Sequence, residues 1–81
     1  MLPVIIDIEA SGFGRGSYPI EIGYHMPDGR SWCTLVHPED DWTHWDPAAE
    51  AVHGIARDLL FKHGRSPAEI CVALNSELRG Q

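Results

Sequence analysis

The sequence is poor in the features that mark secreted and membrane-spanning proteins. Its 81 residues include two cysteines, too few for the disulfide framework on which small secreted domains depend. No apolar run approaches the roughly 18–20 residues that a membrane-spanning helix requires. Met1–Asp7 lacks a basic region and already contains a carboxylate, so we expect no signal peptide. These absences predict a cytoplasmic protein with no membrane partner.

Positive charge is scarce as well. Six Lys and Arg residues stand against twelve Asp and Glu residues, which gives a net charge of −6. Residues 1–41 hold seven of the acids and two of the bases, a net charge of −5. Such a surface does not hold nucleic acid by bulk electrostatic attraction. A nucleic-acid partner would therefore need a small local site, with metal ions as one means of binding.

Length and composition predict a single domain over residues 1–81. Hydrophobic residues make up 43% of the chain and charged residues 22%, which is typical of globular proteins and argues against a disordered or fibrous chain. A chain this short buries only about 60–65% of the surface that its unfolded form exposes, so marginal stability is expected.

Three short strands are expected in the first half of the chain. Val4–Glu9 is apolar and rich in β-branched residues, which is typical of a buried strand. A glycine-rich loop follows, and Pro19 then opens a second run. Pro27-Asp28-Gly29 is a turn signal that joins this run to a third strand as an antiparallel hairpin. The expected strands cover about residues 3–9, 19–26 and 30–37.

Three helices are expected in the second half. Asp46 and Pro47 have the residue types of an N-cap and a first helical position. Ser66 and Glu69 form the pattern of a capping box, and Gly64 is expected to end the preceding helix as its C-cap. The expected helices cover about residues 47–53, 56–63 and 66–79. The sequence therefore predicts an α+β (or α/β) fold in which a three-stranded antiparallel sheet is followed by helices.

Asp7 and Glu9 are the most informative pair of side chains. Because strand residues alternate between faces, both carboxylates leave the same face of the first strand, roughly 7 Å apart. Two carboxylates on an otherwise apolar strand are costly unless they are paired or bound to metal, and their oxygens suit Mg²⁺ or Mn²⁺. The alternative is a strand end that simply emerges into solvent at the two acids. Spacing alone leaves both interpretations open.

The glycine-rich loop holds Gly12, Gly14 and Gly16. A phosphate-binding loop of this kind would lead into a helix N-terminus, whereas Pro19 and a β-rich run follow here, so no nucleotide cofactor is expected. Arg15 lies between two of the glycines, where it either contacts a phosphate or stands at a mobile tip.

Together these motifs resemble the N-terminal half of the DnaQ-like 3′→5′ exonucleases, members of the DEDD superfamily with a ribonuclease H-like fold. Asp7–Phe13 reads Asp-x-Glu-x-Ser-Gly-Phe and resembles the first motif of that family. Glu21-Ile22-Gly23 and His53-Gly54-Ile55 match two later family features. The capped segment that begins at Ser66 resembles the one that leads toward the second motif. The resemblance extends from Val4 to Leu78.

This resemblance implies a metal-dependent hydrolase that removes 3′-terminal nucleotides from DNA or RNA, with a single-stranded or 3′-terminal nucleic acid as its partner. Asp7 and Glu9 would be the catalytic ligands of two Mg²⁺ or Mn²⁺ ions, which activate a water and stabilise the leaving oxygen. Glu21 would support this site without ligating metal. The residues expected to contact the substrate are Ser11, Gly12, Phe13, His53 and Ile55.

The family also requires two further aspartates and a His or Tyr general base, and none has a counterpart here. The sequence ends at Gln81, before the point where the second motif is expected, and Asp58 lies on a helix. We therefore expect a truncated exonuclease with an incomplete two-metal site, inactive alone. The alternatives are a non-catalytic nucleic-acid or protein-binding module of the same fold, and a small α+β domain whose Asp7 and Glu9 are merely solvated.

The first strand carries one further expectation. In the resembled fold the sheet order is 3-2-1-4-5, so this strand would pair with a fourth strand that the 81 residues do not contain. An unpaired apolar edge is a template for another chain. We therefore expect a homodimer through Val4–Glu9, or poor solubility.

Overall fold

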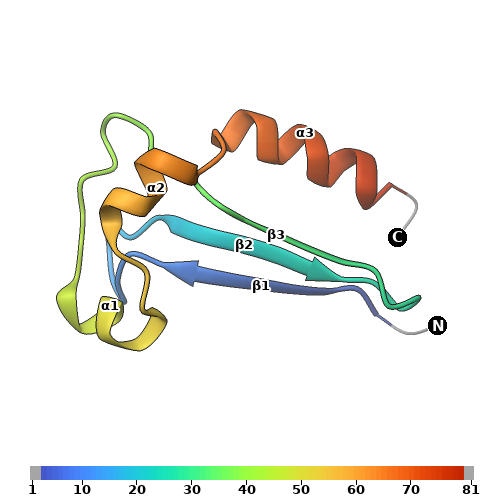
Figure 1. The fold of residues 1–81 in the computed structure, drawn as a ribbon, viewed down its shortest axis with the longest axis horizontal. Coiled ribbons are helices and arrows are strands. Elements are labelled where there is room, and N and C mark those ends of the chain that lie inside the picture. The colour runs from blue at the N-terminus through green and yellow to red at the C-terminus, as the bar shows by residue number, and fades with distance from the viewer. Residues whose placement is uncertain (1–2, 80–81) are drawn as a thin grey trace.

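A computed structural model describes residues 3–79. Three strands, β1 (Ile5–Ala10), β2 (Pro19–His25) and β3 (Ser31–Leu35), form one antiparallel sheet in the order β1-β2-β3. Three helices follow, and their bounds are α1 (Pro47–His53), α2 (Arg57–His63) and α3 (Pro67–Glu77). The expected three-stranded antiparallel sheet followed by helices is confirmed. α3 runs along β3, while α1 lies beside the end of the sheet at which β1 ends (Figure 1).

β1 begins later and β3 ends earlier than the expected ranges. The third range shortens at its end: Val36 still donates its N–H to the Ile20 carbonyl (2.8 Å), but it forms an isolated parallel bridge with Arg65. The N–H of Arg65 donates to the carbonyl of Leu35 (3.0 Å), and the N–H of His37 donates to the carbonyl of Arg65 (2.8 Å). The segment between α2 and α3 is thereby tied to the end of the sheet.

A tight turn joins β2 to β3, as the Pro-Asp-Gly signal predicts. The N–H of Met26 donates to the carbonyl of Arg30 (2.7 Å), and the N–H of Gly29 donates to the carbonyl of Met26 (3.0 Å). Gly29 has a φ of 93°, a left-handed conformation that glycine adopts without steric cost. The carboxylate of Asp28 accepts from the backbone N–H of Arg30 (3.0 Å) and from its Nε (2.8 Å).

The hydrophobic core lies where the start of β2 meets α2. Tyr18, Ile20 and Leu60 are almost completely buried. Trp42 stacks on Tyr18 with ring centroids 5.4 Å apart, and its carbonyl accepts a 2.9 Å hydrogen bond from Arg57. This core sits at one end of the sheet and leaves most of β1 outside it.

The expectation that the first strand is buried is wrong. Ile5, Ile6 and Ile8 expose between 48% and 57% of their surface. Side chains of a strand are buried when other elements cover the face that they leave, whereas β2 is the only described element that packs extensively against β1. In the sheet described, β1 is also the edge strand and pairs with β2 alone. Its other edge therefore leaves backbone N–H and C=O groups unpaired.

The helix ends follow their sequence signals in all but one case. The Asp46 carboxylate accepts from the N–H of Ala48 (2.9 Å), and the Ser66 hydroxyl accepts from the N–H of Glu69 (3.2 Å). Gly64 does end α2, but its φ of −72° is ordinary rather than left-handed. Glycine is required there for space, because an added Cβ would overlap the Leu60 carbonyl oxygen.

α3 is anchored on the sheet near the β2–β3 turn. The Glu77 carboxylate lies 3.8 Å from Arg30, and burial and the Glu77 charge raise the pKa of Tyr24 above its usual value of 10.0. Tyr24 stacks on Trp32, with 5.7 Å between ring centroids. The Arg65 guanidinium lies over the Trp32 ring, 5.8 Å from its centroid. Within residues 3–79, no helix is long and apolar enough to cross a membrane.

Candidate metal and nucleic-acid site

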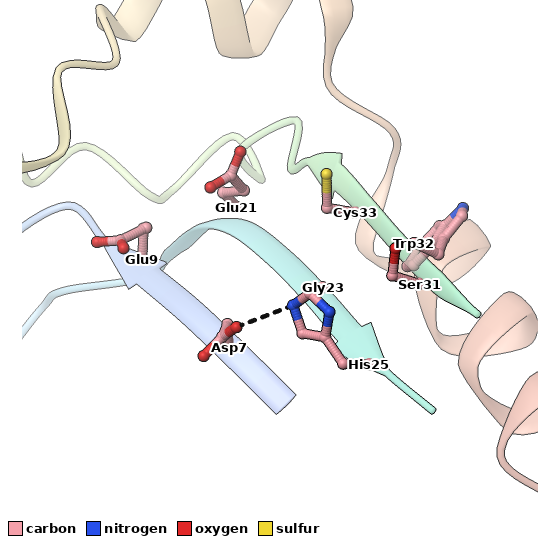
Figure 2. A pocket seen from close by; sticks show the side chains of 8 residues that line it. All are labelled: Asp7, Glu9, Glu21, Gly23, His25, Ser31, Trp32 and Cys33. Carbon is pink, nitrogen blue, oxygen red and sulfur yellow. Dashed lines mark ion pairs between the residues drawn. The ribbon is translucent and has the colours of Figure 1, made fainter. Parts of the chain in front are cut away.

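Side chains from all three strands line a hollow of about 380 Å³ on one face of the sheet. Figure 2 shows the carboxylates of Asp7 and Glu9 on β1 and that of Glu21 on the neighbouring β2. The lining residues are Asp7, Glu9, Glu21, Gly23, His25, Ser31, Trp32 and Cys33.

Strand alternation and register assemble this hollow. Asp7 and Glu9 share a face of β1, and the pairing places Gly23 opposite Asp7 and Glu21 opposite Glu9. Gly23 in turn pairs with Cys33 of β3. An added Cβ at Gly23 would lie 2.8 Å from the Trp32 carbonyl oxygen and 2.9 Å from the Cys33 Cβ. Glycine at this position therefore both permits the close strand pairing and leaves space beside Asp7.

The hollow has a strongly negative lining. Glu9 lies directly across from Glu21, a like-charge pair that destabilises a sheet, and neither has an ion-pair partner within residues 3–79. Among the described residues, the carboxylates of the hollow make one contact with a basic group, from Asp7 Oδ2 to His25 Nε2 at 3.3 Å. A cation bound among these carboxylates would relieve their repulsion.

Carboxylate oxygens are suitable ligands for a divalent cation, but the described residues supply too few of them to surround one. Carboxylate oxygens suit Mg²⁺ and Mn²⁺, and Asp7 and Glu9 present them side by side on β1. Between residues 3 and 79, however, no three His, Cys, Asp or Glu side chains are grouped closely enough to hold a metal ion. The described residues therefore do not form a metal-binding cluster by themselves.

Ser11 holds the glycine-rich loop in place through hydrogen bonds. Its side chain is fully buried, its N–H donates to the Tyr18 carbonyl (3.0 Å) and its hydroxyl accepts from the Tyr18 N–H (3.1 Å). The same hydroxyl lies 3.2 Å from Nδ1 of His44, and the Ser11 carbonyl accepts from the N–H of Asp46 (3.0 Å). Ser11 thus fastens the loop to β2 and to the start of α1. A nucleotide contact from Ser11 stays a prediction.

Gly12 and Phe13 differ sharply in exposure. Gly12 is buried, and an added Cβ would overlap Cε1 of His44. Phe13 exposes 76% of its surface on the same loop, so its ring is open to a stacking partner. Neither residue lines the hollow that contains Asp7 and Glu9.

His53 and Ile55 also lie outside the hollow. His53 ends α1, and its Nδ1 accepts from the backbone N–H of Ile55 (2.9 Å). Its ring packs edge-on against Trp45, with centroids 5.6 Å apart. Its Nε2 is buried and finds no hydrogen-bond partner in the described part of the chain. Ile55 packs against the core, so neither residue shares the hollow with Asp7 and Glu9.

Sequence reasoning missed His25, Ser31 and Cys33 as members of the hollow. The signal was nevertheless present, because His25 follows Glu21 by two strand periods and therefore shares its face. The β2–β3 turn then sets the register that pairs His25 with Ser31.

Comparisons with known proteins bear on the fold. No protein-family model matches the chain, and no curated protein sequence matches it. Among solved structures, the chain is similar to Exonuclease I of E. coli, crystallised in complex with a dT13 oligonucleotide. The TM-score is 0.71 at 19% identity, and the match covers 90% of this chain but 17% of that one. The three antiparallel strands and the helices that follow them thus have the fold of the N-terminal part of an exonuclease.

Proposed function

We propose that this chain is the first part of a metal-dependent 3′→5′ exonuclease, a hydrolase that acts on the 3′ end of single-stranded DNA or RNA. The observation that carries the proposal is the position of Asp7 and Glu9. Both carboxylates lie on one open face of β1, in a chain whose fold matches part of Exonuclease I.

Different residues of the chain would bind the metal ions and the substrate. Asp7 and Glu9 would hold the Mg²⁺ or Mn²⁺ ions, which supply a nucleophilic water and stabilise the leaving oxygen when bound. Glu21 adds negative charge beside them without ligating metal. Phe13 would stack on a base of the substrate, with Gly12 beneath the nucleotide and Ser11 holding the loop. His53 and Ile55 would border the terminal nucleotide from the α1 side.

Hydrolysis would need residues beyond those described. Between residues 3 and 79, the donor set lacks a third ligand next to Asp7 and Glu9. The chain spans 17% of the length of Exonuclease I, so its proposed role is to bind metal and substrate. We expect no nuclease activity from the 81 residues alone.

Titration with Mn²⁺, followed by electron paramagnetic resonance, tests the metal site. We expect weak binding, with a Kd of about 10⁻⁴–10⁻³ M, because two carboxylates make an open site. Asp7→Asn should weaken binding at least about tenfold, since it removes a charge-assisted ligand. Asp58→Asn is the matched control, because Asp58 is an exposed carboxylate on α2 that pairs with Lys62 at 3.4 Å. Equal affinity of wild type and Asp7→Asn would refute the proposal.

The second candidate is a non-catalytic module that binds nucleic acid or protein. It is favoured by the open donor set and by the contact of Asp7 with His25 at 3.3 Å. A nucleic-acid-binding module would bind single-stranded DNA equally well in Mn²⁺ and in a chelator, and a protein-binding module would bind it in neither. The exonuclease proposal instead expects Mn²⁺ to tighten binding, and Asp7→Asn to abolish that gain.

A further inference from the structure

Arg15 differs from most cations of this acidic chain because it forms no ion pair with any of residues 3–79. Arg57 donates hydrogen bonds to Tyr18 and to the Trp42 carbonyl. In the part of the chain that the structure describes, Arg15 and Arg79 take part in no ion pair or side-chain hydrogen bond. The remaining pairs are Arg30 with Asp28 and Glu77, Lys62 with Asp58, and Arg65 with Glu69.

A defined turn presents the Arg15 side chain to solvent. The N–H of Ser17 donates to the carbonyl of Gly14 (3.2 Å), and the N–H of Gly14 donates to the Ser17 hydroxyl (3.3 Å). Gly16 takes the left-handed φ of 82° that closes the turn. The contacts of Ser11 described above fasten the base of the loop. Arg15 is therefore exposed on a turn whose shape is set by its own hydrogen bonds.

Phe13 lies two residues before Arg15 on the same loop. The loop follows directly after Ala10, the last residue of the strand that carries Asp7 and Glu9. In Figure 1 it lies at the end of the sheet next to α1. The loop just beyond the carboxylate strand therefore carries an exposed aromatic ring and, two residues later, an exposed guanidinium.

This combination matches one nucleotide unit of a single strand. An aromatic ring stacks on any base, and a guanidinium offers paired N–H donors whose geometry fits a phosphate. Residues 1–41 have a net charge of −5, which repels a phosphate backbone. A phosphate would therefore bind there at a local cation. Arg15 is the only Lys or Arg before Arg30.

We propose that Arg15 binds a backbone phosphate of the single-stranded nucleic acid, and that this contact requires no metal ion. The inference rests on the proposed function for the identity of the ligand. It adds a second, metal-independent point of attachment to the Asp7 and Glu9 site. An acidic peptide would offer charge to Arg15 but no base to Phe13.

Fluorescence anisotropy with labelled oligo(dT) in EDTA tests the contact without any contribution from metal. We expect Arg15→Gln to weaken binding about tenfold, through the loss of one charge-assisted contact. The slope of log K against log salt concentration should become shallower by about 0.7, the value for one phosphate on a single strand. Arg15→Lys should retain most of the slope, because a point charge still meets the phosphate.

Arg79→Gln is the matched control, because Arg79 is also exposed, pairs with none of residues 3–79 and lies beyond α3. We expect it to leave both affinity and slope unchanged. Equal losses in Arg15→Gln and Arg79→Gln would overturn the proposal, since they indicate non-specific attraction. An unchanged slope in Arg15→Gln would overturn it too. Circular dichroism should show the same melting curve for all variants, because neither arginine supports another residue.

The two proposals fail separately. Intact Mn²⁺ binding at Asp7 with no oligonucleotide binding in EDTA would remove the Arg15 contact and leave the metal site standing. Arg15-dependent binding in EDTA, together with a metal affinity that Asp7→Asn does not change, would remove the exonuclease proposal alone.

Discussion

Asp7 Oδ2 lies 3.3 Å from His25 Nε2, and the two side chains belong to neighbouring strands. The contact is diagonal, because the residue directly opposite Asp7 is Gly23, which has no side chain to intervene. The side chains of Asp7 and His25 are 72% and 59% exposed. An exposed pair of this kind contributes about 1 kcal/mol or less, so a metal ion can displace it at little cost.

Removing the imidazole should therefore favour metal binding. We expect His25→Ala to tighten Mn²⁺ binding about two- to fivefold, the range that the loss of one exposed pair allows. Isothermal titration would measure the change, and His63→Ala, an exposed histidine at the end of α2, serves as control. Weaker binding in His25→Ala would mean instead that the imidazole holds Asp7 in position for the metal.

Gly23 should tolerate no side chain. We expect Gly23→Ala to destabilise the protein by about 1–3 kcal/mol, the usual cost of overpacking, because the new Cβ would press on the Trp32 carbonyl and on Cys33. Urea denaturation would measure the loss. Gly14→Ala provides the comparison, since an added Cβ there meets nothing within 4 Å. Similar stability of the two variants would contradict the strand spacing described here.

The β2–β3 turn should lose stability in acid. The hydrogen bond from the Arg30 backbone, with a further contribution from its side chain, lowers the pKa of Asp28 below its ordinary 3.8. Because the folded pKa is the lower one, this stabilisation is complete above pH 3.8 and is lost as the pH falls through the folded value. Asp28→Asn keeps the turn-forming side chain but removes the charge. Urea denaturation at neutral pH and at about pH 2 should show that the wild type has a higher free energy of unfolding than Asp28→Asn, by an amount that shrinks in acid. The same difference at both pH values would contradict a role for the Asp28 charge.

The free edge of β1 should make the chain self-associate. Sedimentation velocity at rising concentration should show a dimer or larger species, because three exposed isoleucines accompany unpaired backbone groups. Ile6→Lys should restore the monomer, since natural edge strands use charge to block pairing. Val52→Lys changes an equally apolar, exposed residue on α1 and should not. A monomer at every concentration tested would end the idea of dimerisation through β1.

The sequence predicted the features that depend on neighbouring residues. The Pro27–Gly29 turn, the Asp46 cap and the Ser66 cap are local signals, and each forms in the structure. The side-by-side placement of Asp7 and Glu9 follows from strand alternation alone.

What the sequence did not predict depends on distant contacts. The apolar run marks Ile6 and Ile8 as core residues, yet their burial requires an element that covers their face of β1, and no described helix packs extensively there. The role of Ser11 in supporting the loop comes from His44 and Asp46, more than thirty residues away. No pattern local to the Ser11 loop contains that information.

The bridge between Val36 and Arg65 also determines the direction in which the chain leaves the sheet. It starts α3 at the far end of β3, and Glu77 brings the end of α3 back to Arg30, beside the β2–β3 turn. His25, next to that turn, pairs with Ile5, the first residue of β1. A strand that continued from α3 along the free edge of β1 would therefore run parallel to β1, because α3 would serve as the helical crossover between them. Its later residues would lie level with Asp7 and Glu9.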